Sequence, residues 1–96
     1  MLIITTFHGH RYKIHPNSFI ERTDMKFVPS DSWRLLGITH VNHSRRVISF
    51  SNIEKWLTTQ PALRFKNGDP VWAVLDLDHN TIRQWGDRII SIYREA

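Results

Sequence analysis

The sequence predicts a small α+β domain, in which an antiparallel sheet of short hairpin strands carries a long amphipathic C-terminal helix. Two observations predict this fold. Short segments rich in Thr, Ile and Val alternate with Gly and Asn turns, as in strands joined by hairpins. From Ile82 to Tyr93, apolar residues recur at steps of three and four, which is the period of a helix packed through one face. With 96 residues and 41% hydrophobic content, residues 1–96 are expected to form a single domain around one modest core.

Two hairpins are expected in the first half of the chain. Residues 2–7 and 10–15 favour strands and flank Gly9, which supplies the turn. A second hairpin is expected on either side of residues 42–44, an Asn-His-Ser turn. Between the two hairpins, residues 32–36 follow a Pro-Ser-Asp segment, so they are predicted to form one helical turn that ends at the next glycine.

The next elements are a helix and two strands. Ser51 and Glu54 have the spacing of a capping box, which predicts a helix that ends before Pro61. Residues 62–66 and 71–77 are predicted as strands separated by an Asn-Gly-Asp-Pro turn. The second of these strands is apolar nearly throughout, so it is expected to be central and covered on both faces.

The long C-terminal helix is predicted to begin with a second capping box, formed by Thr81 and Gln84. Its apolar stripe includes Gly86, where the missing side chain would allow a close approach to the sheet. Arg83 and Asp87 fall on the polar face at the spacing of a weak helical ion pair.

Composition excludes several classes of protein. The chain has no cysteine, which excludes disulfides, thiolate catalysis and Cys-based zinc sites, and the cytoplasm is the expected location. No apolar run approaches the roughly 18 residues that cross a bilayer. The N-terminal segment lacks the basic region of a signal peptide. No membrane association is therefore expected.

The net charge of +4 belongs to the first half of the chain. Residues 1–50 contain seven Lys and Arg residues against three acidic residues, whereas residues 51–96 contain six of each. A local excess of this kind attracts an anionic partner, either a nucleic acid or an acidic protein surface.

The segment AVLDLDHNTI, residues 73–82, resembles the nucleophile loop of the haloacid-dehalogenase-type phosphatases, an apolar strand followed by Asp-x-Asp-x-Thr. The threonine comes one residue too late, and the 18 residues after Asp78 are predicted to form only a helix. They therefore leave no room for the remaining catalytic groups of that family. No catalytic residue is predicted, and Asp76 and Asp78 are expected to stabilise the start of the C-terminal helix.

Five of the six histidines lie in the first half of the chain: His8, His10, His15, His40 and His43. Three converging imidazoles would make a zinc site, and the two hairpins leave that convergence open. Neither spacing is a specific metal-binding signature, so these histidines are expected at the surface. No metal or other cofactor is predicted.

A small metal-independent ribonuclease is one alternative function, because such enzymes combine acid–base groups with a cation for the phosphate. The residues that would serve are His8, His10, Arg11, Tyr12, Lys13, Arg45 and Arg46.

Direct nucleic-acid binding is a stronger alternative. Arg11, Lys13 and His15 alternate onto one face of the second predicted strand, with Tyr12 on the other face. A basic strand face can follow a phosphate backbone, and Phe7 or Tyr12 could stack on a base. The predicted nucleic-acid-binding residues are therefore Arg11, Tyr12, Lys13 and His15.

The favoured function is docking onto a protein partner without catalysis. Of the four tryptophans, Trp56, Trp72 and Trp85 are expected in the core, whereas Trp33 stands beside Arg34 after a loop. Trp and Arg are enriched at interface hot spots. The predicted partner-binding residues are Trp33, Arg34, Arg45 and Arg46. The chain is thus expected to regulate or inhibit a cytoplasmic protein complex, plausibly one that processes nucleic acid, as accessory proteins of phages and mobile elements do. The sequence leaves the oligomeric state open.

Overall fold

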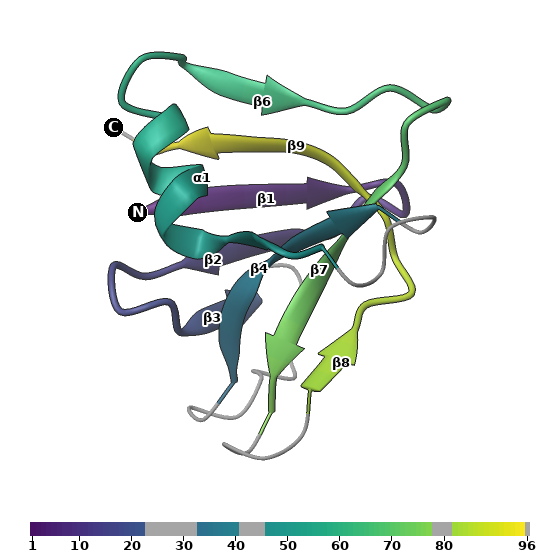
Figure 1. The fold of residues 1–96 in the computed structure, drawn as a ribbon, viewed down its shortest axis with the longest axis horizontal. Helices are drawn as coiled ribbons and strands as arrows, with labels where there is room; N and C mark the ends of the chain where they lie inside the picture. Colours follow the sequence, from purple (N-terminus) through teal and green to yellow (C-terminus); the bar gives the residue numbers. More distant parts are fainter. Residues whose placement is uncertain (23–32, 41–45, 78–81, 96) are drawn as a thin grey trace.

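The computed structural model describes residues 1–22, 33–40, 46–77 and 82–95. Within these ranges, nine strands form one antiparallel sheet, and the only helix has seven residues (Figure 1). The strands are β1 (Leu2–Thr6), β2 (Arg11–Ile14), β3 (Ile20–Arg22), β4 (Arg34–His40), β5 (Ile48–Ser49), β6 (Ala62–Arg64), β7 (Val71–Asp76), β8 (Ile82–Gln84) and β9 (Ile89–Arg94), and the helix is α1 (Phe50–Trp56). The antiparallel sheet was expected, but the predicted α+β fold with a long C-terminal helix is wrong.

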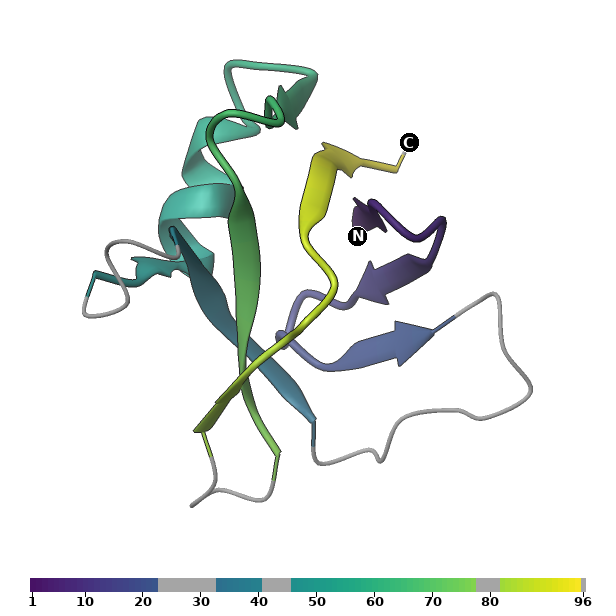
Figure 2. The ribbon, with the colours of Figure 1, turned by 90° about the vertical axis from the view of Figure 1, so that its right-hand side faces the viewer.

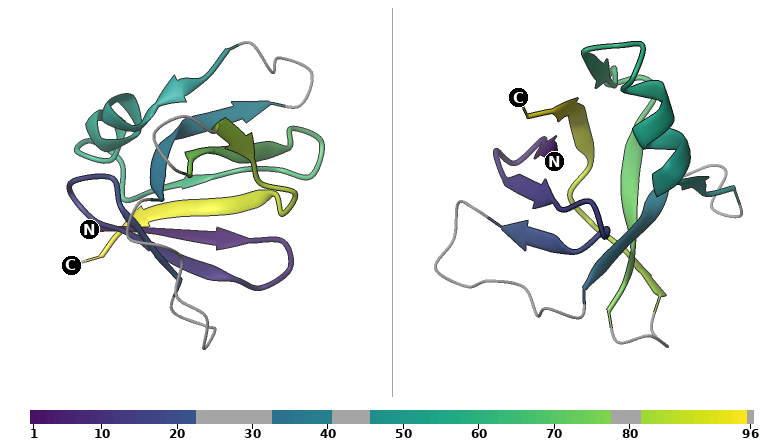
Figure 3. Two further views of the ribbon diagram at one scale, coloured as in Figure 1. Left: turned by 90° about the horizontal axis from the view of Figure 1, so that it is seen from below. Right: turned by 90° about the vertical axis from the view of Figure 1, so that its left-hand side faces the viewer.

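The sheet folds over on itself into two layers. Its strand order is β3-β2-β1-β9-β7-β4-β5, with β6 added beside β9 and β8 beside β7. Because β7 and β9 share only the pair Val71–Ile89, the sheet bends sharply between them (Figure 2). One layer contains β3, β2, β1 and β9, and the other contains β4 and β7 (Figures 2 and 3). At the far edge, a bridge between Phe19 and Arg34 joins the two layers again.

The C-terminal segment forms β9, and a single bulge explains the helix-like spacing of its apolar residues. Thr5 pairs with Ser91 and Thr6 pairs with Ile89, so Ile90 is an extra residue without a partner on β1. One extra residue moves the buried positions of a strand from a step of two to a step of three. Ile89 and Ile92, exposed to 1% and 0%, are the two buried residues on either side of it. The bulge therefore gave the strand an apolar spacing that imitates a helix.

The residues before β9 also depart from the predicted helix. Ile82, expected on the apolar stripe, belongs to the short strand β8 and is 71% exposed. Gly86 makes no close approach to the sheet, since a Cβ atom built there would meet nothing within 4 Å. Trp85 packs instead against the buried ring of Tyr12, with ring centroids 4.0 Å apart. Trp85, which was predicted to lie on the apolar stripe of a helix, thus contacts the core from a loop.

The two predicted hairpins are confirmed. β1 and β2 pair in antiparallel register around Gly9, whose φ of +84° suits a residue without a side chain. β4 and β5 pair in the same way, although β4 occupies the segment where a helical turn was predicted. Gly37 lies inside β4, where a Cβ atom would stand 2.0 Å from the carbonyl oxygen of Ile48. This glycine therefore permits the contact with β5 and does not end a helix.

The short helix and the strands after it differ from the predictions in detail. The N-cap of α1 is Ser49, whose hydroxyl accepts a hydrogen bond from the backbone N–H of Asn52, and not Ser51. Trp56, expected in the core, is 39% exposed. β7 is central, as predicted, and pairs with β4 and β8. β6, the strand before β7 in the chain, pairs with β9.

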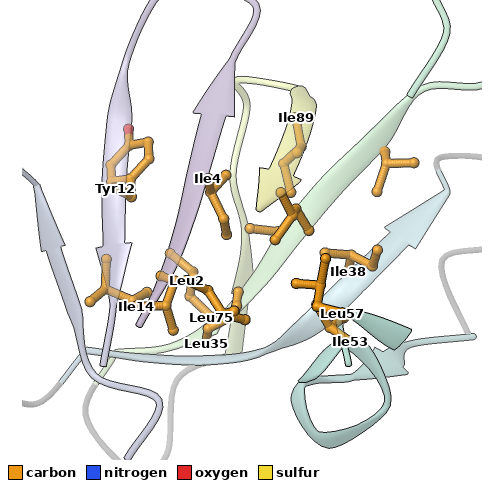
Figure 4. Packing of buried hydrophobic residues seen from close by; sticks show 14 residues of the cluster. Leu2, Ile4, Tyr12, Ile14, Leu35, Ile38, Ile53, Leu57, Leu75 and Ile89 are labelled. Atoms are coloured by element: carbon orange, nitrogen blue, oxygen red, sulfur yellow. The ribbon is translucent and has the colours of Figure 1, made fainter. Parts of the chain in front are cut away.

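The core fills the space between the two layers (Figure 4). Ile4 from β1 and Leu75 from β7 are completely buried, and α1 closes one side with Ile53. Burying each such side chain contributes roughly 1.5–3 kcal/mol. The core cluster consists of Leu2, Ile4, Tyr12, Ile14, Ile20, Leu35, Ile38, Ile53, Leu57, Val71, Ala73, Leu75, Ile89 and Ile92.

The close approach at Gly37 gives a test of the fold. Gly37→Ala is expected to lower the free energy of unfolding by about 1–3 kcal/mol, because the new methyl group forces β5 away from β4. Urea denaturation followed by tryptophan fluorescence measures this change. Gly68→Ala is the matched control, since its Cβ atom meets nothing within 4 Å. Equal stability of the two variants would contradict the β4–β5 register.

Candidate nucleic-acid interface

The sheet surface of β2, β1, β9 and β6 that faces away from the core carries two cross-strand rows of side chains. The first row runs through Arg11, Thr5, Ser91 and Arg64, and the second through Lys13, Ile3, Tyr93 and Ala62. Their alternation with buried neighbours such as Ile4, Tyr12 and Ile92 places both rows outside the core. We call the polar members, Thr5, Arg11, Lys13, Arg64, Ser91 and Tyr93, the basic face.

Hydrogen bonds across the strands order the basic face. The Arg11 guanidinium donates to the hydroxyl of Tyr93 at 2.9 Å, and the hydroxyls of Thr5 and Ser91 bond to one another. Arg11 and Arg64 are both exposed. They are three strands apart, which corresponds to about 14 Å between their backbones. Two guanidinium groups thus flank a row of hydroxyl groups.

A shallow hollow borders the basic face at the junction of β6 and β9, with a volume of about 500 Å³. Ile90 and Tyr93 contribute apolar surface to its lining, and Arg64 lies at its side. This combination suits a planar aromatic group next to a negative charge. The hollow is lined by Ala62, Arg64, Phe65, Ile90, Ser91 and Tyr93.

At the end of the β1–β2 hairpin, two histidines face one carboxylate. The Nε2 atoms of His8 and His10 lie 3.9 Å from Oδ1 and Oδ2 of Asp87, respectively. The Thr6 hydroxyl donates to Oδ2, and the backbone N–H of His8 donates to Oδ1 at 3.2 Å. The side chain of Asp87 is only 14% exposed, whereas those of His8 and His10 are 65% and 33% exposed. Two accessible imidazoles therefore face one largely buried carboxylate, and we call these three residues the histidine cluster.

A cation and an aromatic ring lie beside the histidine cluster. The guanidinium carbon of Arg88 lies 4.2 Å from the ring centroid of Phe7, which is itself 56% exposed. The backbone N–H of Phe7 donates to the carbonyl of Arg88 at 2.9 Å, which joins the hairpin to the residue before β9 at this pair. This pair can offer a positive charge and a stacking surface to the same ligand.

The other sequence-predicted residues of the first half are distributed as follows. Lys13 and Arg11 lie on the basic face, but Tyr12 is 6% exposed in the core and cannot stack on a ligand. His15 lies at the edge of the same surface, with its Nε2 atom 3.1 Å from the carboxylate of Glu21. His40 lies 2.9 Å from Asp69. His43 and Arg45 are outside the described residues.

The three predicted docking residues that the structure describes lie near the two ends of β4. Arg34 begins β4, with its guanidinium 4.7 Å from the ring centroid of Phe19 and its Nε buried without a hydrogen-bond partner among the described residues. Trp33 precedes it and is half-buried. Arg46 is exposed and its carbonyl accepts a hydrogen bond from Thr39, near the other end of β4. Arg34 and Thr39 are about 17 Å apart along the strand.

Asp76 lies at the end of β7, cross-strand from Arg34, and not at the start of a helix. Its Oδ1 atom is buried and has no hydrogen-bond partner within the described ranges. The dehalogenase-like segment therefore ends a central strand. Asp78 and Thr81 lie outside the described residues.

The sequence reasoning missed the part of the site that β6 and β9 supply. Arg64, Ser91 and Tyr93 join the basic face only because β9 pairs with β1. Asp87 was assigned to the polar face of a helix, whereas it binds the β1–β2 hairpin. The signal that could have found them is the β-branched run at Ile89 and Ile90, which favours a strand.

Comparisons with protein-family models, characterised proteins and solved structures find no significant match to this chain. The site is therefore interpreted from its own geometry. Within residues 1–22, 33–40, 46–77 and 82–95, no three His, Asp or Glu side chains are grouped to hold a metal ion. The same residues include no helix of the length and apolar character that a membrane crossing requires.

The role of Asp87 in holding the hairpin can be measured. Asp87→Ala is expected to lower the free energy of unfolding by about 2 kcal/mol, because the buried Thr6 hydroxyl and the His8 N–H lose their charged acceptor. Thermal and urea denaturation provide the measurement. Asp69→Ala is the control: its side chain is 70% exposed and its pairing with His40 is worth at most about 1 kcal/mol. A loss at Asp87 no greater than that at Asp69 would be inconsistent with this anchoring role.

Proposed function

We propose that the protein binds single-stranded nucleic acid on the basic face. The observation that carries this proposal is the row of Arg11, Thr5, Ser91 and Arg64 across four strands, in which both arginines are exposed. Arg and Lys neutralise phosphates, and Ser, Thr and Tyr hydroxyls donate to phosphate and sugar oxygens. The face offers both kinds of group on a surface that strand pairing makes rigid.

The charges of the face support an anionic ligand. Arg11, Lys13 and Arg64 are its three basic residues, and the carboxylate nearest in register is Glu21, the cross-strand partner of Lys13 on β3. That carboxylate lies 3.1 Å from His15, at the far edge from Arg64. The positive charge therefore dominates the middle of the face and the β6 side.

A single strand fits this site better than a duplex. The hollow beside Arg64 has Tyr93 in its lining, an aromatic residue that an unpaired base can contact more readily than a paired base can. Reading a duplex groove requires a protruding helix or ribbon. The described part of the chain has one seven-residue helix, which packs on the core through Ile53. The face is instead a platform on which successive nucleotides can lie.

Salt-dependent binding tests the proposal. Fluorescence anisotropy with a labelled oligonucleotide should give affinity that falls steeply as the salt concentration rises. The triple variant Arg11→Ala/Lys13→Ala/Arg64→Ala removes three phosphate-binding charges, and the slope of log K against log salt should then decrease by about 2. Lys55→Ala, an exposed lysine on α1 outside the basic face, is the charge control and should keep the wild-type slope. An unchanged slope in the triple variant, or no binding at low salt, would refute the proposal.

Docking onto a protein is the second candidate function. The observation that favours it is a group of exposed apolar side chains next to Arg46. Val47 is 45% exposed and covers Gly37, whose neighbour Leu36 is 37% exposed. An arginine beside exposed apolar side chains is a common composition for an interface. The test is an affinity capture from a nuclease-treated lysate. If this surface binds a protein partner, the wild type should retain that partner and the variant Arg46→Ala/Val47→Ser should not.

A further inference from the structure

We propose that the histidine cluster cleaves single-stranded RNA by metal-independent acid–base chemistry, with His8 and His10 as the acid–base pair and Asp87 as their positioning residue. This inference rests on the function proposed above, because the basic face would hold the strand. The cluster lies at the hairpin end of the strands that carry that face: His10 precedes Arg11 on the chain, and Thr6 follows Thr5.

The carboxylate faces both rings. An imidazole that donates Nε2–H to a carboxylate carries its lone pair on Nδ1, where it can accept a proton from a substrate. His8 and His10 both turn Nε2 towards Asp87, one towards each carboxylate oxygen. The separations of 3.9 Å are longer than hydrogen bonds, as is common for catalytic contacts before a substrate closes the site. The Asp87 carboxylate itself is held by hydrogen bonds from the Thr6 hydroxyl and the His8 backbone N–H.

Two histidines with different exposure suit the two proton transfers. His8 is 65% exposed and can approach a ligand as the base. His10 is 33% exposed and is packed edge-on to Tyr12, with ring centroids 6.4 Å apart. In its protonated form His10 would be the acid, held in place by the Asp87 carboxylate.

The neighbouring groups supply what phosphoryl transfer needs besides a base and an acid. Arg88, 4.2 Å above the Phe7 ring, can stabilise the negative charge that develops on the phosphate. Phe7 is exposed and can stack on the base next to the scissile bond. Base, acid, cation and stacking ring are therefore gathered at one end of the β1–β9 pair.

RNA is the substrate because it carries its own nucleophile. Nδ1 of His8 takes the proton of a 2′-hydroxyl, and that oxygen forms a bond to the adjacent phosphorus. The bond between phosphorus and the 5′-oxygen breaks, and the His10 imidazolium gives its proton to the departing oxygen. The products are a 2′,3′-cyclic phosphate and a 5′-hydroxyl, and no oxidant, reductant or further reactant is consumed. Proton exchange with water restores both histidines. DNA lacks the 2′-hydroxyl and should be bound but left intact.

The experiment uses end-labelled single-stranded RNA and DNA of one sequence, with the full chain and in the presence of EDTA. Binding is measured by anisotropy and cleavage by denaturing gel, with the product ends identified by mass spectrometry. The wild type should yield cyclic-phosphate ends from RNA with a bell-shaped dependence of rate on pH. His8→Ala and His10→Ala should each slow cleavage by about 100-fold or more, while the affinity for DNA stays unchanged.

A matched control is available in the chain. His40 also lies beside an aspartate, at 2.9 Å from Asp69, and its exposure of 32% is close to that of His10. His40→Ala should cleave at the wild-type rate. Asp87→Asn keeps an acceptor for Thr6, so it should fold; it should lower kcat without changing KM, which a loss of stability alone would not do.

The outcomes separate this inference from the proposed function. If wild-type protein binds RNA and leaves it intact, the ribonuclease inference is overturned and the binding function stands. If cleavage persists in His8→Ala/His10→Ala, the activity is not that of this site and the inference is likewise overturned. If neither RNA nor DNA binds, both fail.

Discussion

The pairing of β1 with β9 is the interaction on which the rest of the structure depends. It brings the two ends of the described chain together, from Leu2 beside Arg94 to Thr6 beside Ile89. Both of its strands bury completely an isoleucine in the core, Ile4 and Ile92. Because its contacts join residues far apart in sequence, the ladder forms only when most of the chain is already ordered. One face of this strand pair lines the core, and the opposite face carries part of the basic face.

The same pair determines which side chains can act together. Ile3 is 1% exposed, although it lies in the same cross-strand row as Lys13 and Tyr93. Long side chains of this kind can cover an apolar neighbour and still bring their polar ends to the surface. At one end of the pair, Asp87 binds the hairpin tip through Thr6 and so joins the histidines to β9. The basic face lies on strands, which hold functional groups more precisely than loops do, whereas the histidine cluster lies on the hairpin loop and the segment before β9.

The sequence predicts the parts of the fold that depend on local chemistry. The Gly9 turn, the alternation of Arg11 and Lys13 and the central position of β7 all follow from neighbouring residues. β9 was predicted wrongly because its bulge at Ile90 gives a three-residue spacing, and only the pairing with β1 distinguishes that spacing from a helix. The site was half predicted for the same reason: β2 residues were found, whereas those of β6 and β9 depend on non-local pairing. Two serines two residues apart can each cap α1, so its start was misplaced.

An NMR titration with a short single-stranded RNA tests the central claim that the β1–β9 pair builds the working surface of this protein. A variant that binds RNA without cleaving it, such as His8→Ala, keeps the ligand intact during the measurement. The account predicts that amide shifts concentrate on β2, β1, β9 and β6, at Arg11, Thr5, Ser91 and Arg64 together, although these residues are scattered over the sequence. Shifts confined to Trp33, Arg34 and Arg46, or no shifts at low salt, would contradict it.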